Sequence, residues 1–208
     1  SRNQGKVREF AAWFGKLGLS VRSLADYGDI PDIVEDGETF LDNALIKART
    51  VAGLLGGPVL ADDSGLTVDA LGGAPGVYSA RYAGQHGSDE ANNQKLLAEL
   101  ARVTTLSHRL GAEHPPVWSR AAFVCALALV DPVSGTEVTV EGTCEGYIIG
   151  QPVGSKGFGY DPLFYVPALG RTFAELDTGE KNRISHRAQA TRRLVELLGS
   201  NRVVGQTE

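Results

Sequence analysis

The sequence predicts a mixed α/β domain over residues 1–208, with a central sheet flanked by helices. Three observations predict it. Segments whose apolar residues follow the 3.6-residue period of a helix alternate with apolar segments typical of strands. Two of those strands are separated by a short turn, as in a hairpin, and the hairpin with its neighbours is long enough for a second lobe. The 208 residues contain no internal repeat or flexible linker and can bury a substantial core.

The first part of the chain predicts two helices. Asn3 can cap a helix whose apolar positions follow the helical period and which ends at Gly18. Thr39 and Asp42 have the spacing of a capping box for a second helix. That helix runs to Leu55, where a Gly-Gly-Pro sequence stops it.

The next stretch predicts a strand, a loop and a helix. Residues 58–61 are typical of a short buried strand that ends at the polar residues 62–65, the place where open α/β sheets bind ligands. Glycines over residues 72–76 indicate a loop. A helix follows over residues 88–103, and residues 104–119 indicate an exposed connection whose two histidines lie in solvent.

The second half predicts the hairpin and two more helices. Residues 121–130 are apolar on both faces, as in a central strand, and a turn leads into the second strand over residues 136–147. Asp177 or Thr178 can cap a short helix, and Ser185 can cap a final, longer one.

Composition and charge exclude several classes of protein. The chain has 25 acidic against 20 basic residues, a balance of −5 that argues against coating nucleic acid or an anionic membrane. Its apolar runs are too short to span a bilayer, so we expect a cytoplasmic protein. Cys125 and Cys144 are expected to be reduced thiols in the core. Because the chain lacks Met and Ser1 leads almost directly into a helix, we expect a short strand before Ser1.

A polar loop over residues 1–6 is the first candidate site. It opens a helix with a glycine and Lys6 in the first turn, so free backbone N–H groups and an ammonium group could bind phosphate. The loop lacks the G-x-x-x-x-G-K-[ST] pattern of a P-loop. The alternative is an ordinary helix cap with a solvated lysine.

Adjacent carboxylates form the second candidate site. Asp62 and Asp63 repel each other, and a hard cation such as Mg²⁺ would resolve that repulsion. Glu35, before the second helix, could supply another oxygen, and Ser64 could donate to a phosphate. The alternative is a polar exit from the strand into a turn.

Two further segments suit a flat heterocyclic base. Phe158 stands between glycines, where its ring could stack on a base, and Asp161 could accept a hydrogen bond from the base edge. Lys181, with the basic pair over residues 186–187, could donate to a carbonyl-rich base edge or a phosphate. The alternatives are a glycine-rich loop that buries one aromatic ring and a solvated basic turn. Together the four segments describe a nucleotide polyphosphate site.

These segments, in this order, resemble the inosine/xanthosine triphosphate pyrophosphatase family over almost the whole chain. The matching segments are Ser1-Arg2-Asn3-Gln4-Gly5-Lys6, Glu35-Asp36-Gly37-Glu38-Thr39-Phe40 with Asn43-Ala44 and Lys47-Ala48, Ala61-Asp62-Asp63-Ser64-Gly65-Leu66, Gly73-Ala74-Pro75-Gly76-Val77-Tyr78-Ser79-Ala80-Arg81-Tyr82, Gly157-Phe158-Gly159-Tyr160-Asp161-Pro162, and Glu180-Lys181-Asn182 with Ser185-His186-Arg187. The connection over residues 104–119 is longer than is usual for this family.

The resemblance implies an elongated, two-lobed α/β fold, a homodimer, and Mg²⁺-dependent hydrolysis of ITP, dITP and XTP to the nucleoside monophosphate and pyrophosphate. It implies that Asp63 is the catalytic carboxylate, which binds the metal and accepts a proton, with Asp62 beside it and Glu35 as a further metal ligand. The residues that it implies for substrate binding are Ser1, Arg2, Asn3, Gln4, Gly5, Lys6, Ser64, Phe158, Gly159, Tyr160, Asp161, Lys181, His186 and Arg187.

Two other functions fit the same residues. One is a module that binds nucleotides or nucleic acid without catalysis; polyanion binding of that kind would weaken steeply with salt, whereas a compact nucleotide site would require Mg²⁺. The other is a related pyrophosphatase that acts on modified pyrimidine nucleotides, which base preference would distinguish.

Overall fold

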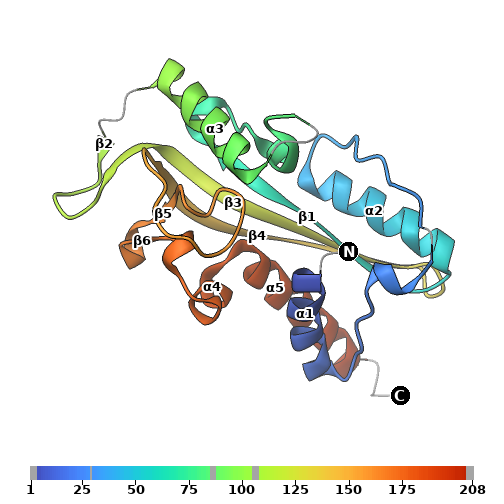
Figure 1. Ribbon diagram of the computed structural model, residues 1–208. Helices are drawn as coiled ribbons and strands as arrows, with labels where there is room; N and C mark the ends of the chain where they lie inside the picture. Colours follow the sequence, from blue (N-terminus) through green and yellow to red (C-terminus); the bar gives the residue numbers. More distant parts are fainter. Residues whose placement is uncertain (1–3, 29, 85–87, 105–107, 205–208) are drawn as a thin grey trace. The chain divides into compact units, whose positions relative to one another are not determined.

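The computed structural model describes residues 4–28, 30–84, 88–104 and 108–204, and it confirms the α/β class (Figure 1). Short 3-10 turns link some of the main elements. In chain order the helices and strands are α1 (Gln4–Phe14), α2 (Phe40–Leu55), β1 (Val59–Val68), α3 (Asp89–Val103), β2 (His108–Arg109), β3 (Pro116–Asp131), β4 (Thr136–Ile149), β5 (Phe164–Val166), β6 (Arg171–Thr172), α4 (Thr178–Ile184) and α5 (His186–Val204).

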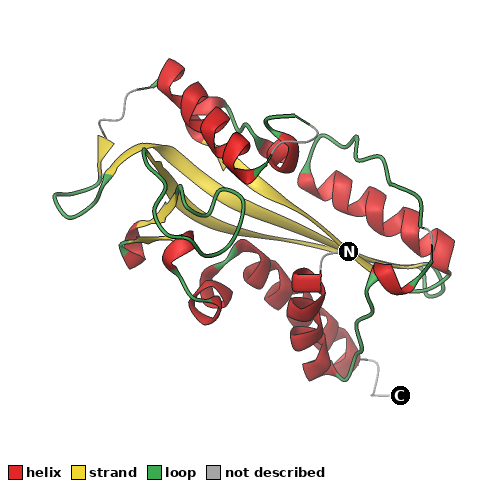
Figure 2. Cartoon of the chain, viewed as in Figure 1, coloured by secondary structure: helices red, strands yellow, loops and turns green. Residues whose placement is uncertain are grey.

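The strands of the described residues form one sheet in the order β1-β3-β4-β5-β6, with β2 paired to β3. The pairs β2–β3, β4–β5 and β5–β6 are antiparallel. The strands are drawn in yellow in Figure 2. The chain divides into two compact units, and the residue ranges of β1, β3 and β4 each extend into both. Unit 1 comprises residues 1–63, 125–142 and 187–208, and unit 2 comprises residues 64–124 and 143–186.

In unit 1, helices cover both faces of the strands. Helix α2 lies on one side, and α1 and α5 lie on the other (Figure 1). Phe10 and Phe14 of α1 form a buried cluster with Leu194 of α5 and Leu127 of β3. This packing fixes α1 and α5 against each other and against β3.

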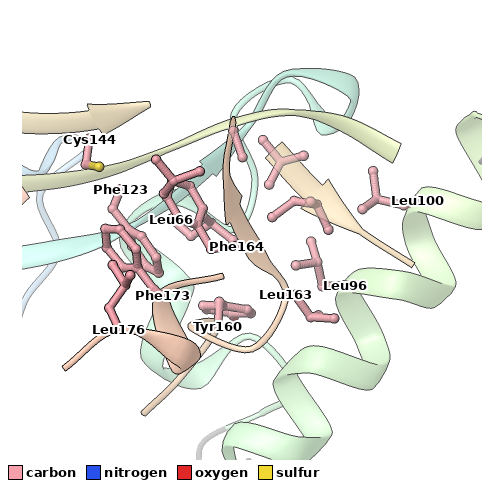
Figure 3. Close-up of a cluster of buried hydrophobic side chains, with 14 residues drawn as sticks. Leu66, Leu96, Leu100, Phe123, Cys144, Tyr160, Leu163, Phe164, Phe173 and Leu176 are labelled. Carbon is pink, nitrogen blue, oxygen red and sulfur yellow. The ribbon is translucent and has the colours of Figure 1, made fainter. Parts of the chain in front are cut away.

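In unit 2, the core is built around three phenylalanine rings (Figure 3). Phe123 of β3 stacks on Phe173 with ring centroids 5.5 Å apart, and both rings contact Phe164 of β5. Leu96 and Leu100 of α3 are fully buried in the same cluster. These contacts attach α3 to the segment that carries Phe164.

Three of the helix caps expected from the sequence are confirmed, whereas Asn3 lies outside the described residues. Helix α2 begins after Thr39, whose hydroxyl accepts from the Asp42 N–H while the Asp42 carboxylate accepts from the Thr39 N–H. It ends at Gly56, where φ is 66°. Ser88 caps α3, and Asp177 caps α4. Within the described residues, no helix is long and apolar enough to cross a membrane.

Both cysteines are buried and free, as expected. Burial raises the pKa of the Cys125 thiol to about 12 and that of the Cys144 thiol to about 11. The thiols are therefore protonated at neutral pH and behave as small apolar side chains.

Two sequence-based predictions are wrong. The strand predicted to end at Ala61 continues as β1 to Val68, so residues 62–65 are extended rather than turned. The connection over residues 104–119 contains β2 and the start of β3. Its His114 is half-buried and forms a 2.8 Å hydrogen bond between Nδ1 and the Tyr165 hydroxyl. The side chain of the other histidine, His108, lies outside the described residues.

Gly65 is required by a close approach of the backbone and not by a turn. A Cβ atom at this position would lie 2.3 Å from Ser79 Oγ and 2.8 Å from the Gly76 carbonyl oxygen. The same Ser79 hydroxyl accepts from the Leu66 N–H at 2.9 Å, so it cannot move away without loss of that hydrogen bond.

We therefore expect Gly65→Ala to lower the free energy of unfolding by roughly 1–3 kcal/mol, the usual cost of overpacking. Urea unfolding followed by circular dichroism measures this. Gly53→Ala is the control, because Gly53 lies in α2 and a Cβ added there would meet nothing within 4 Å. It should stabilise the protein by about 0.5–1 kcal/mol. Equal stability of the two variants would contradict the close-approach explanation.

Candidate functional site

Asp62 and Asp63 point to opposite faces of β1, because successive side chains of an extended strand alternate. Asp63 faces α2, where its carboxylate accepts from Lys47 Nζ at 2.9 Å and from Asn43 Nδ2 at 3.4 Å. Asp62 faces the other way, towards α1 and the start of α5. The adjacent carboxylates therefore belong to two separate groups of side chains.

Lys47 joins Asp63 to Glu35. Its ammonium nitrogen lies 2.9 Å from Asp63 Oδ1 and 3.1 Å from Glu35 Oε2. Burial lowers the pKa of Lys47, but the two carboxylates raise it by more, so the pKa lies above its ordinary value. Burial, together with the charge of Glu35, raises the pKa of Asp63 against the opposing effect of Lys47. We call Glu35, Asn43, Lys47 and Asp63 the Lys47 cluster.

Asn43 connects the loop before α2 to this cluster. Its Oδ1 accepts from the Gly37 N–H at 2.9 Å while its Nδ2 donates to Asp63. A Cβ at Gly37 would lie 2.8 Å from Asn43 Oδ1, so the glycine permits the close contact. This fixes the segment that carries Glu35, two residues before Gly37.

Lys47 and Asn43 were not among the candidate site residues drawn from the sequence. The available signal was their spacing: they stand four residues apart on α2, so they share one face of the helix. Ala44, Ala48 and Val51 make the helix largely apolar and buried around them. A buried amide and a mostly buried ammonium on such a helix require partners.

Asp62 forms a second ionic group with Lys6 and Arg187. Its side chain is 5% exposed, and its Oδ2 lies 2.6 Å from Lys6 Nζ and 3.8 Å from Arg187 Nε. Burial raises the pKa of Asp62, but the charges of Lys6 and Arg187 lower it by more, and the net pKa lies below its ordinary value. The structure thus brings Asp62 to Lys6 and does not bring it into the Lys47 cluster.

The Lys47 cluster offers two carboxylates to a divalent metal ion. Glu35 and Asp63 both place a carboxylate oxygen about 3 Å from one cationic nitrogen, so they already share a positive charge. Mg²⁺ prefers oxygen ligands and typically uses one or two carboxylates with phosphate oxygens and water for the rest. In the described part of the chain, no group of three or more His, Cys, Asp or Glu side chains could hold a metal by itself. Glu35 and Asp63 supply the one or two carboxylates that such a metal uses.

In unit 2, Phe158 presents its ring to solvent. The residue is 60% exposed, and the ammonium of Lys181 lies 5.4 Å from the ring centroid. Asp161 is buried beneath, where its Oδ2 accepts from the Phe158 N–H at 3.0 Å and from Lys181. This oxygen, Oδ2, therefore bonds within the protein. The contact with a base that the sequence predicts would have to be made by the other oxygen of Asp161, Oδ1. Tyr160 is buried and donates its hydroxyl to the Ser79 carbonyl at 2.8 Å.

The other candidate residues fall in several places. His186 is buried and stacks on Phe123, with centroids 5.0 Å apart. Ser64 is half-buried in β1. Gln4 and Gly5 lie in the first turn of α1, and the side chain of Gln4 is outside the described part. Ser1, Arg2 and Asn3 also lie outside the described residues.

Comparison with known proteins gives a consistent result. The family model described as the Ham1 family matches residues 1–197. A dITP/XTP pyrophosphatase from Geobacillus kaustophilus is 53% identical over 196 residues, which cover 94% of this chain and 90% of that protein. Another from Bacillus licheniformis is 51% identical, with 95% of each chain covered. A solved HAM1 protein from Coxiella burnetii superposes with a TM-score of 0.86, 41% identity and 96% of each chain covered. This chain belongs to the Ham1 family.

Proposed function

We propose that this protein hydrolyses the non-standard purine nucleoside triphosphates ITP, dITP and XTP to the nucleoside monophosphate and pyrophosphate. The observation that carries the proposal is the Lys47 cluster, in which Glu35 and Asp63 converge on one cation. The dITP/XTP pyrophosphatases that match at about 50% identity over nearly the whole chain support the substrate class. The enzyme would remove deaminated purines from the cytoplasmic nucleotide pool.

In the proposed reaction, a water oxygen attacks the α-phosphorus, the bond to the α–β bridging oxygen breaks, and pyrophosphate leaves. Asp63 accepts the proton from the water, and burial, which raises its pKa, suits it to that role. Lys6 and the backbone N–H groups at the start of α1 bind phosphate oxygens. Mg²⁺ held by Glu35 and Asp63 would stabilise the negative charge that develops on the triphosphate.

The base is proposed to bind in unit 2. The exposed ring of Phe158 offers a stacking surface, and Lys181 lies over it with its donors available to a base edge. Lys181 and His186 of unit 2 are the proposed donors to the position-6 carbonyl of hypoxanthine or xanthine. Donors there would oppose the amino group of adenine, which gives selectivity against ATP.

The experiment that tests this function is a substrate panel. The purified protein is incubated with Mg²⁺ and, separately, ITP, XTP, dITP, ATP, GTP and a modified pyrimidine triphosphate, and the products are separated by ion exchange. Monophosphate with pyrophosphate from ITP or XTP, and little from ATP or GTP, supports the proposal. Turnover of the pyrimidine alone, or Mg²⁺-dependent binding without turnover, would favour the alternative functions. Orthophosphate as the first product would contradict the reaction.

Lys47→Met is expected to lower kcat about 10²-fold or more, because the two carboxylates lose the cation that holds them together. Pyrophosphate release at saturating ITP and Mg²⁺ measures it. Lys16→Met, which removes an ammonium that lies over the Trp13 ring at the end of α1, is the control and should retain turnover. If Lys47→Met retained full kcat, the bridging role would be wrong.

We further infer a homodimer without nucleic-acid or membrane partners. The homodimer is what the family resemblance implies, and the balance of −5 disfavours polyanionic partners. Light scattering coupled to gel filtration tests the assembly against the 22.0 kDa mass of one chain.

A further inference from the structure

Two side chains of α3 hold the peptide groups on either side of Gly159. Asp89 Oδ2 accepts from the Gly159 N–H at 2.6 Å, and Asn93 Nδ2 donates to the Gly159 carbonyl oxygen at 2.9 Å. Asp89 and Asn93 stand four residues apart, so one face of α3 presents both. Ser88 caps this turn of the helix, since its hydroxyl accepts from the Ala91 N–H at 3.1 Å.

Gly159 is the left-handed residue of a tight turn. Its φ is 61°, and the turn closes where the Phe158 carbonyl accepts from the Asp161 N–H at 3.3 Å. That closing bond uses neither the N–H nor the carbonyl of Gly159. The turn thus leaves the N–H and the carbonyl of Gly159 to bond with Asp89 and Asn93 of α3. The hydrogen bond from the N–H to the Asp89 carboxylate is of the stronger, charge-assisted kind.

Apolar packing holds α3 to one side of the loop over residues 152–163 and is missing on the other. Leu96 of α3 belongs to the same buried cluster as Tyr160 and Leu163. On the Phe158 side a cavity of about 410 Å³ opens, and its lining includes Leu97 of α3 with Pro152, Phe158 and Pro162 of the loop. Because van der Waals contact is missing there, the two polar contacts at Gly159 are what holds this side of the loop to α3. One of the two peptide groups that they hold joins Phe158 to Gly159.

We propose that Asp89 and Asn93 are positioning residues for the purine base, acting through the orientation of Phe158. They do not touch the base. They fix the turn that follows Phe158, and this turn sets the orientation of the Phe158 ring beside Lys181. This inference rests on the proposed function for its kinetic consequence, whereas the contacts at Gly159 are independent of it. Preorganisation of this kind increases affinity by removing the cost of ordering the loop on binding.

Kinetics provide the first test. Asp89→Ala should raise KM for ITP or XTP roughly 5- to 20-fold, as expected for loss of a hydrogen bond to a charged group, with kcat changed less than about threefold. Asp89→Asn keeps an acceptor oxygen and should restore most of the affinity. Glu90→Ala removes the same charge from the same turn and should leave KM unchanged. The inhibition constant of inorganic tripolyphosphate, which has no base, should not change in any variant.

A double-mutant cycle tests whether Asp89 acts through Phe158. In the Phe158→Ala background, Asp89→Ala should raise KM less than about twofold, because the stacking ring that it positions is gone. Equal effects of Asp89→Ala in the two backgrounds would overturn the proposal. So would a KM for Asp89→Ala equal to that of Glu90→Ala.

Hydrogen exchange provides a readout that does not need activity. In Asp89→Ala and Asn93→Ala, amides of residues 157–161 should exchange faster, while those of α5 and the urea midpoint stay unchanged. If the wild-type protein failed to hydrolyse ITP or XTP, the proposed function would fail, and exchange at 157–161 would still decide whether α3 holds the loop. Unchanged exchange there would refute the attachment itself. If Asp89→Ala did not fold, Asn93→Ala carries the same test.

Discussion

Asp63→Asn should lower the turnover of ITP or XTP by roughly 10²- to 10⁴-fold, the range typical of losing a general base. Asparagine keeps the size of the side chain and one acceptor oxygen, which serves the 2.9 Å contact from Lys47 but not also the 3.4 Å contact from Asn43, so the Lys47 cluster should keep most of its shape. What disappears is the negative charge that accepts a proton and contributes to metal binding. KM should change much less than kcat if the lost interaction belongs mainly to the transition state.

The measurement is kcat from pyrophosphate release across a range of Mg²⁺ concentrations. A recovery of activity at high Mg²⁺ would assign most of the effect to metal affinity, and a loss that persists would assign it to proton transfer. Asp36→Asn is the control, because Asp36 is an exposed carboxylate beside Glu35 and its replacement should leave kcat unchanged. Full turnover by Asp63→Asn would show that the catalytic role belongs to another residue.

Asp62→Ala is expected to have the largest effect on stability, about 3–5 kcal/mol, because it removes a buried negative charge that faces two cations. Arg187 is buried, Lys6 is mostly buried, and both form ion pairs with the carboxylate of Asp62. Urea unfolding gives the free energy. Asp62→Asn, which keeps hydrogen-bond acceptance, should be intermediate and serves if the alanine variant does not fold.

The comparison is with an exposed ion pair of the same unit. Arg49 contacts Glu137 through two nitrogens, at 2.7 and 2.8 Å, but solvent screens the charges. Arg49→Ala should therefore cost no more than about 1 kcal/mol. If the two substitutions destabilised the protein equally, burial would not be the reason for the importance of Asp62.

Helix boundaries were predictable because their signals are local. The reciprocal bonds of Thr39 and Asp42 span three residues, and Gly56 ends α2 with a backbone angle that glycine adopts without strain. The length of β1 was not predictable in the same way. Gly65 has the local preference of a turn, but it lies within β1, which is hydrogen-bonded to β3, a strand distant in the sequence that only the tertiary fold brings alongside.

The same distinction applies to the candidate site. The carboxylates of Glu35 and Asp63 could be proposed from residue type, because few other residues suit a hard cation. The bridging position of Lys47 could not, since it depends on how α2 packs against β1. Likewise, Asp161 was predicted to face a base, and the structure adds that one of its oxygens holds the Phe158 N–H and Lys181.

The extended path of β1 through Asp62 and Asp63 limits how this segment can change in length. Since side chains alternate along a strand, deleting one residue between Val59 and Asp62 would exchange the two faces. Asp63 would then meet Lys6 and Arg187, and the Lys47 cluster would receive Ser64 in place of a carboxylate. A substitution in this strand alters one side chain, whereas such a deletion takes the carboxylate from the Lys47 cluster and moves every later side chain of the strand to the other face. We therefore expect β1 to evolve by replacement of residues and to keep its length between Val59 and Ser64.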